Sequence, residues 1–209
     1  MHPLPPGLTL RPRLIRPGGA QPSLELVRDH LAVGLMVEED DALRRVTVQD
    51  LADWRTSLEK LLPLALEQLR QDSPSSRWQP VSSAPGTRLF LSGDGESASR
   101  MLIMGHLLQA WPLGGVIVAC PSADQFLCVP LDSVEDLEAI HVLATATRFA
   151  HQVAREPLSD QVFWNDGSQW HHLLVRHTDQ AVEIDPPPEF LATIGRLAAV
   201  DLVEAAAEA

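Results

Sequence analysis

Hydrophobic and polar positions follow a readable order along the middle of the chain, from residue 98 to residue 136. Four apolar residues first recur at helical spacing: Met101, Met104, Leu108 and Trp111. A short β-branched run at 114–120 and a second strand-like run at 126–129 follow, separated by a tight turn. Strands joined by so short a turn must pair antiparallel, so this segment predicts an α+β fold.

The flanking sequence predicts further strands and helices. Strands are expected at residues 24–27, 31–38, around Val46, 78–81, 87–91, 162–164 and 169–177. Helices are expected at residues 47–54, after Ser57, from Ser133 to about Glu156, and beginning at 185–188. The sharpest turn signal is Asn165-Asp166-Gly167, which is typical of a β-hairpin.

Two long helices in the C-terminal half each carry an apolar stripe that we expect to face the core. In the helix after Ser133, the stripe consists of Val142, Ala146, Phe149 and Val153. In the last helix, it consists of Leu191, Ile194, Ala198 and Leu202. Both helices are therefore expected to pack on the sheet through these residues.

These elements predict a single α+β domain, with a mainly antiparallel sheet of hairpins packed against several helices. Its core is expected at residues 24–178, followed at 179–209 by a C-terminal helix that packs on the core and frays at its Ala-rich end. Residues 1–23 are rich in proline and arginine, which is typical of an extended arm. The 209 residues, 45% of them hydrophobic, supply enough apolar material for one core.

The strongly acidic net charge limits the partners of the protein. A formal charge of -12 and a pI near 5.0 argue against binding a nucleic-acid backbone, which requires clustered lysine and arginine. Lys60 is the single lysine and does not belong to a G-x-x-x-x-G-K-[ST] loop, and Schiff-base chemistry is disfavoured for the same reason. No segment has the roughly 20 apolar residues of a membrane helix, and none resembles an export signal. We therefore expect a cytoplasmic protein that binds no membrane.

Both cysteines, Cys120 and Cys128, fall on the expected central hairpin. A two-residue turn at Ala123-Asp124 pairs Cys120 with Leu127 and places the two sulfur atoms on opposite faces of the sheet. A three-residue turn would instead bring the sulfur atoms directly opposite each other. In a chain without an export signal, we expect two reduced, buried thiols.

Nucleophilic catalysis would have to use Ser122 or Cys120. Ser122 lies in the turn, where we expect it to be exposed, with Asp124 beside it. The Gly-x-Ser-x-Gly elbow is absent, and Pro-Ser-x-Asp is also ordinary turn chemistry, since both polar side chains bond nearby backbone groups. The alternative function is therefore a small hydrolase that pairs Ser122 or Cys120 with a histidine from the strand at 169–177.

The chain has eight histidines but no chelating spacing. His171 and His177 share one face of a strand but lie roughly 20 Å apart, at about 3.3 Å per residue, and His172 lies on the other face. A zinc site needs three or four ligands that converge on one point. We therefore expect no metal and no other cofactor.

A cationic stripe on the helix after Ser133 is the least expected feature of so acidic a chain. His141, Arg148 and Arg155 recur every seven residues and are expected to lie opposite the apolar stripe. Such a stripe suits an acidic partner or an anion; solvation, or pairing with the protein's own carboxylates, is the alternative.

With no assembled catalytic set, the sequence favours a non-enzymatic protein-interaction module of regulatory or immunity type. Its partner would be another protein, and Ser122 and Asp124 join the stripe as candidate binding residues.

Five segments between about residues 24 and 174 carry a family resemblance. They are Leu31-Ala-Val-Gly-Leu-Met-Val37 before an acidic turn, Val46-Thr-Val-Gln-Asp-Leu51, Leu64-Ala-Leu-Glu-Gln-Leu69, Ala98-Ser-Arg-Met-Leu102, and Val118-Ala-Cys-Pro-Ser-Ala-Asp124 with Phe126-Leu127. On these segments the chain resembles the YtpQ-like family of uncharacterised bacterial proteins. The aligned turn usually carries a basic residue before the aspartate, where this chain has Ala123. The resemblance implies no activity, because none is established for the family.

Overall fold

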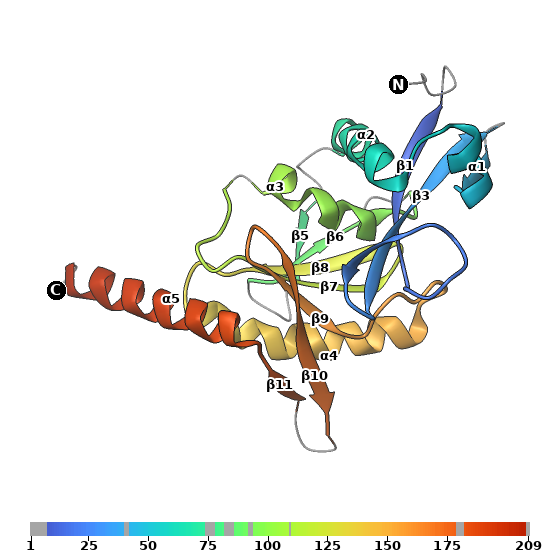
Figure 1. Cartoon of the computed structure of the whole chain (residues 1–209). Helices are drawn as coiled ribbons and strands as arrows, with labels where there is room; N and C mark the ends of the chain where they lie inside the picture. The colour runs from blue at the N-terminus through green and yellow to red at the C-terminus, as the bar shows by residue number, and fades with distance from the viewer. Residues whose placement is uncertain are drawn as a thin grey trace.

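The structure is a computed structural model that describes residues 8–39, 42–73, 78–81, 86–91, 94–108, 110–178 and 182–207. Within these ranges, eleven strands form two antiparallel sheets, accompanied by five α-helices and two 3-10 helices (Figure 1). This arrangement confirms the predicted α+β class. The strands are β1 (Thr9–Ile15), β2 (Leu24–Val27), β3 (Leu31–Glu39), β4 (Ala42–Arg45), β5 (Trp78–Pro80), β6 (Arg88–Phe90), β7 (Val116–Ser122), β8 (Gln125–Pro130), β9 (Val162–Asn165), β10 (Trp170–His177) and β11 (Val182–Asp185). The helices are α1 (Val48–Asp53), α2 (Leu58–Gln71), η1 (Ser97–Ile103), α3 (Met104–Leu107), η2 (Glu135–Leu137), α4 (Glu138–Val153) and α5 (Pro188–Ala207).

The larger sheet has seven strands in the order β11-β10-β9-β7-β8-β6-β5. Each neighbouring pair is antiparallel. Three of these pairs are the predicted hairpins β5–β6, β7–β8 and β9–β10. The strands predicted within 114–120, 126–129 and 169–177 all belong to this antiparallel sheet. That prediction is confirmed.

β7 lies at the centre of the larger sheet and is buried along its whole length. On one face, Val118 belongs to an apolar cluster that includes Met101 of η1. On the other face, Ile117 belongs to a cluster with Leu143 of α4 and Leu197 of α5. Figure 1 shows α4 and α5 on one side of this sheet and α3 on the other, so the sheet is a middle layer with an apolar core on each side.

The smaller sheet is built around β3, whose first seven residues are buried. β1 pairs with one edge of β3, while β2 and β4 pair in succession with the other edge. β1 falls within the segment expected to be an extended arm. Its Leu10 and Leu14 are buried and alternate with the less buried Arg11 and Arg13, as in a strand with one face on the core. Residues 1–7 of the expected arm lie outside the described residues.

A network around Asp50 holds the start of α1 against β4. Thr47 and Asp50 form a reciprocal capping box, which explains why the predicted helix begins at this point. Arg44 of β4 donates two hydrogen bonds to Asp50, at 2.8 Å and 3.0 Å. This guanidinium lowers the pKa of Asp50 to about 2, so the cap stays ionised at neutral pH.

α4 packs on the larger sheet through a different side from the one expected. Its buried residues are Ala139, Ile140, Leu143, Ala144 and Thr147. Val142, Phe149 and Val153, which we expected in the core, are exposed instead, so that expectation is wrong. Ile140, Leu143 and Ala144 of the buried side join the core cluster that contains Ile117 of β7, so contact with the sheet selects this side of the helix.

α5 has apolar residues on all of its sides. The buried residues of the helix are Phe190, Thr193 and Leu197. Of the expected stripe, Ile194 and Ala198 are half-buried, but Leu191 and Leu202 are exposed, and for these two the expectation is wrong. Figure 1 shows the second half of α5 extending away from the sheet, which explains the exposure of Leu202. The expected fraying concerns an end whose last residues, 208–209, lie outside the described part. No helix in the described residues is long and apolar enough to cross a bilayer.

The β7–β8 hairpin has the expected two-residue turn, but its register shifts between Ala119 and Ser122. This shift is a β-bulge, which adds one residue to one strand only and moves Cys120 to the face that carries Cys128. Both cysteines belong to the same apolar cluster, where they are buried free thiols. Of the two arrangements that the sequence left open, the structure combines the two-residue turn with sulfur atoms on the same face.

Gly115, just before β7, makes a close backbone approach to β9. Its φ is +79°, in the left-handed region, and a Cβ on it would lie 2.3 Å from the carbonyl oxygen of Asn165 and 2.8 Å from Trp164 Nε1. The neighbouring Gly114 carbonyl oxygen accepts a 2.8 Å hydrogen bond from Trp164 Nε1. A side chain at position 115 would disturb both the backbone and this bond.

We predict that Gly115→Ala lowers the free energy of unfolding by about 2–4 kcal/mol, because of left-handed strain and the displaced β9 backbone. Urea unfolding followed by tryptophan fluorescence measures the change. The control is Gly195→Ala in α5, where an added Cβ meets nothing within 4 Å. This control should be neutral or stabilise by up to about 1 kcal/mol. Equal stability of the two variants would contradict the close approach.

Candidate functional site

The exposed side of α4 carries the cations that the sequence singled out. His141 and Arg148 are exposed on the helix, and Arg155 is exposed just beyond its end. None of these three side chains forms a hydrogen bond or ion pair with another described residue. Phe149 and Val153 are exposed on the same helix. At about 100° per residue, Phe149 lies about 100° and Val153 about 140° round the helix axis from Arg148, so the cations and the apolar residues flank the exposed side. We call these five residues the α4 outer face.

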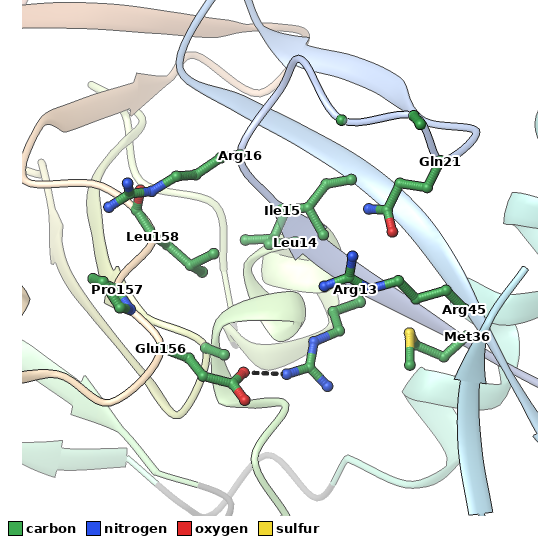
Figure 2. A pocket seen from close by; sticks show the side chains of 13 residues that line it. Arg13, Leu14, Ile15, Arg16, Gln21, Met36, Arg45, Glu156, Pro157 and Leu158 are labelled. Carbon is green, nitrogen blue, oxygen red and sulfur yellow. Dashed lines mark hydrogen bonds and ion pairs between the residues drawn. The ribbon is translucent and has the colours of Figure 1, made fainter.

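A pocket of about 660 Å³ lies between the smaller sheet and the segment that links α4 to β9 (Figure 2). Its walls are residues 13–16 and 19–21 of β1 and the following loop, Met36 of β3, Arg45 of β4, Ala123 of the β7–β8 turn, and residues 156–158. Because three of its lining side chains are arginines, we call it the arginine pocket. It is lined by residues of both sheets that are far apart in the sequence.

Strand register decides which cations face this pocket. Arg13 of β1 pairs with Gly34 of β3, and Arg45 of β4 pairs with Met36 of β3. Directly paired residues point to the same face, and so do residues two apart on one strand. Arg13 and Arg45 therefore project from one face of the sheet, on either side of β3. Gln21 extends over Gly34, 3.5 Å from where a Cβ would lie.

The carboxylate of Glu156 neutralises one of these two arginines. It forms an ion pair with Arg13, drawn as a dashed line in Figure 2. Its side chain is 59% exposed, so the pair is accessible to water. The Arg45 guanidinium makes no hydrogen bond or ion pair with any described residue. The pocket therefore contains the unpaired guanidinium of Arg45 as well as the guanidinium of Arg13, which is paired with Glu156.

Arg16 lies at the border between the arginine pocket and a second cavity of about 440 Å³, which is lined in part by Asp29 and His30. It donates to the Leu158 carbonyl oxygen at 2.9 Å and contacts His151 Nε2 at 2.8 Å. Because a guanidinium can only donate, His151 accepts through an unprotonated nitrogen and is neutral in this contact. Both partners of Arg16 are thus uncharged, and its positive charge is not compensated by them.

The remaining wall of the arginine pocket is partly polar and partly apolar. Gln21 Oε1 is buried and accepts no hydrogen bond from the described residues. Ile15, Met36 and Leu158 supply apolar surface. The pocket thus combines positive charge, a free acceptor and an apolar wall, which are the features of a site that orients a small ligand.

Ser122 is buried, with 4% of its surface exposed, so the expectation that it is exposed is wrong. Its backbone forms an isolated bridge with Pro157, which covers the end of β7. Asp124 is exposed in the turn, and Ala123 between them lines the arginine pocket. In the described part of the chain, no histidine hydrogen-bonds to Ser122 or to Cys120. The structure therefore does not assemble the nucleophile and base of a hydrolase around either residue.

The two buried thiols are expected to be unreactive. Burial raises the pKa of Cys120 and of Cys128 far above its ordinary value, because a thiolate would lose its hydration. The Cys120 sulfur lies 3.0 Å from the Met101 sulfur, within the apolar cluster. Neither cysteine has the electropositive, accessible surroundings of a reactive nucleophile.

The histidines of β10 lie on two faces, as strand geometry requires. His172 lies against His30 of the β2–β3 turn, with ring centroids 3.9 Å apart and ring planes tilted by 41°. Its Nε2 lies 3.0 Å from Gln161 Oε1. Burial and the neighbouring His30 lower the pKa of His172 to about 4. His171, on the opposite face, lies beside Trp164. No group of three or more metal-ligating side chains occurs among the described residues.

Sequence reasoning missed the arginine pocket because residues 1–23 were interpreted as an arm. A signal was present: Leu10-Arg11-Pro12-Arg13-Leu14 alternates between apolar and basic residues, which is typical of a strand with one buried face. The position of Arg45 depends on how β4 pairs with β3. A four-residue strand with exposed ends does not fix that register from sequence.

Comparisons with protein-family models, with curated proteins and with solved structures found no match. The resemblance to the YtpQ-like family therefore stays a prediction. Function has to be inferred from the geometry of the α4 outer face and of the arginine pocket.

We predict that Cys120 and Cys128 resist alkylation by iodoacetamide at pH 8 in the folded protein and react fully in urea, because neither forms thiolate while it is buried. Mass spectrometry after timed quenching measures the modification. A variant with an exposed cysteine, Ser168→Cys in the β9–β10 turn, provides the reactive control. Rapid modification of Cys120 in the folded state would contradict its burial and revive a thiol nucleophile.

We predict that stability falls as pH is lowered from 6.5 towards 4, because the folded protein binds a proton at His172 less readily than the unfolded chain does. The contribution is fully present above the ordinary histidine pKa. It amounts to about 1–2 kcal/mol after allowance for solvent screening of the half-buried ring. Urea unfolding across this range measures it.

The pH dependence should be flatter in His172→Gln and unchanged in His141→Gln, whose side chain is exposed on α4. An identical pH profile for His172→Gln and the wild type would show that another group is responsible.

Proposed function

We propose that the protein is a non-enzymatic interaction module that binds another protein through the α4 outer face. The observation that carries this proposal is that Phe149 and Val153 are each 68% exposed on α4, the helix that also carries Arg148, whose side chain has no partner among the described residues. A regulatory or immunity-type role in the cytoplasm fits this proposal, since free thiols are usual in a reducing compartment.

The composition of the α4 outer face resembles the centre of a protein interface. Burying a phenylalanine side chain contributes about 1.5–3 kcal/mol, and aromatic and arginine side chains are enriched where binding energy concentrates. Phe149 has little to gain from packing within this chain, because most of its surface is in water. A partner that covers the Phe149 side chain gains the free energy of its burial, and the protein does not have to rearrange its core.

The charges indicate what the partner looks like. Arg148 and Arg155 suit carboxylates, which guanidinium groups bind in a bidentate manner. The net charge of -12 repels an acidic partner at long range, so the contact depends on charges within about 8 Å, the screening length at physiological salt. We therefore propose a partner segment in which apolar residues are flanked by aspartate or glutamate, such as an amphipathic helix.

The small hydrolase has weaker support. Ser122 and Cys120 are buried, and no histidine accompanies either of them in the described residues. Nucleic-acid binding has no support from the sequence. Acidic residues outnumber basic ones, 28 to 16, whereas a phosphate backbone is bound by clustered lysine and arginine.

Charge reversal on the α4 outer face tests the proposal. We predict that Arg148→Glu with Arg155→Glu weakens binding to the partner by about tenfold or more, and more strongly at low salt. Phe149→Ser should weaken it by a similar factor. Affinity capture from native lysate identifies the partner, and titration calorimetry with the purified partner measures the dissociation constants. Thermal stability should stay nearly constant, because the three side chains are exposed.

The matched control is Arg28→Glu with Arg176→Glu, which changes the net charge equally at exposed positions on other elements. Binding that survives in both α4 variants, or that falls equally in the control, would contradict the proposed surface. A large loss of stability in the α4 variants would mean that these residues serve folding.

A further inference from the structure

The arginine pocket concentrates positive charge in a chain whose net charge is -12. Of the 16 lysine and arginine residues in the sequence, Arg13, Arg16 and Arg45 line this pocket. Glu156 is the one carboxylate among its described lining residues. Three cations and one carboxylate leave an excess of two positive charges. Like charges that face one space destabilise the folded state unless an anion or water compensates them.

The cations also have unused bonding capacity. The Arg45 guanidinium forms no hydrogen bond or ion pair with the described residues, and the acceptors of the Arg16 guanidinium are a carbonyl oxygen and a neutral ring nitrogen. Arg13 is held by Glu156, but an exposed ion pair contributes little to stability, so its carboxylate can be displaced at small cost. Glu156 also shows that a carboxylate fits against Arg13 in this pocket.

The size and the apolar wall define the rest of the ligand. A volume of about 660 Å³ lies within the roughly 300–1,000 Å³ typical of small-molecule sites. A bare inorganic anion would leave the half-buried Ile15 and Leu158 in contact with water, whereas a short hydrocarbon body would cover them. The free acceptor Gln21 Oε1 suits a hydroxyl or N–H group on the same ligand.

We propose that the arginine pocket binds a small organic oxyanion, namely a carboxylate or a phosphate monoester attached to a short apolar body. The oxyanion lies between Arg45 and Arg13 and takes the place of the Glu156 carboxylate, and the body rests on Met36 and Leu158. Guanidinium groups bind either oxyanion in a bidentate manner, so the two head groups share one chemistry. The site is separate from the proposed function, because no residue of the α4 outer face lines the pocket.

Titration calorimetry of the full chain with hexanoate, phenyl phosphate and inorganic phosphate tests this proposal and distinguishes the head groups. We expect saturable one-to-one binding of at least one organic probe, and weaker binding of inorganic phosphate, which has no apolar body. The organic probe that binds more tightly identifies the head group. The same probes should protect the protein against thermal unfolding in the same order.

Four variants separate a built site from nonspecific attraction. Arg45→Gln should weaken binding of the preferred probe by at least about tenfold, since it removes a charge-assisted hydrogen bond. Ala20→Phe should abolish binding by filling the pocket while every charge is kept. Glu156→Gln should strengthen binding several-fold, because the internal competitor is gone. Arg28→Gln removes the same charge outside the pocket lining and should change nothing.

Circular dichroism and thermal unfolding establish that each variant is folded. If Ala20→Phe does not fold, the opposite effects expected of Arg45→Gln and Glu156→Gln still decide the matter. Absence of saturable binding at millimolar concentrations would overturn the site, as would equal loss of affinity in Arg28→Gln and Arg45→Gln. Equal affinity for inorganic phosphate and for the organic probes would overturn the assignment of an organic ligand.

Discussion

The burial of β7 on both of its faces is the constraint on which the rest of the structure depends. A strand whose seven residues are all buried needs an apolar layer above and below the sheet. α4 and α5 supply one layer, and η1, α3 and the smaller sheet supply the other. Leu14 of β1 and Leu31 of β3 belong to the same cluster as Val118 of β7, so the second core ties the two sheets together.

Both candidate surfaces follow from this arrangement. Because Leu14 is directed into the shared core, Arg13 beside it must point the other way, into the space where the smaller sheet meets the segment after α4. On the opposite side of the larger sheet, α4 packs through a side that includes Ile140 and Leu143, so Phe149 and Val153 are left outside. Packing of the core thus determines which polar and apolar groups remain for binding.

The sequence predicted most of the local structure and little of the candidate site. Hairpins with strong turn signals, such as the one around Asp166, are fixed by nearby residues, and so is the capping box of Thr47 at the start of α1. The face of α4 was predicted wrongly, because its residues form two competing apolar stripes and only contact with the sheet selects one. The arginine pocket depends on pairing between β1 and β3 across a loop, and such register is a tertiary property.

The bulge before Ser122 has a further consequence for how the molecule can be studied. It gathers both thiols, Cys120 and Cys128, on the inner side of the central hairpin, where no reagent arrives without separating the layers. The rate of thiol labelling therefore reports how often this region opens, and its dependence on denaturant distinguishes local opening from global unfolding. The protein thus contains a built-in probe for the dynamics of its own core, with no label to be introduced.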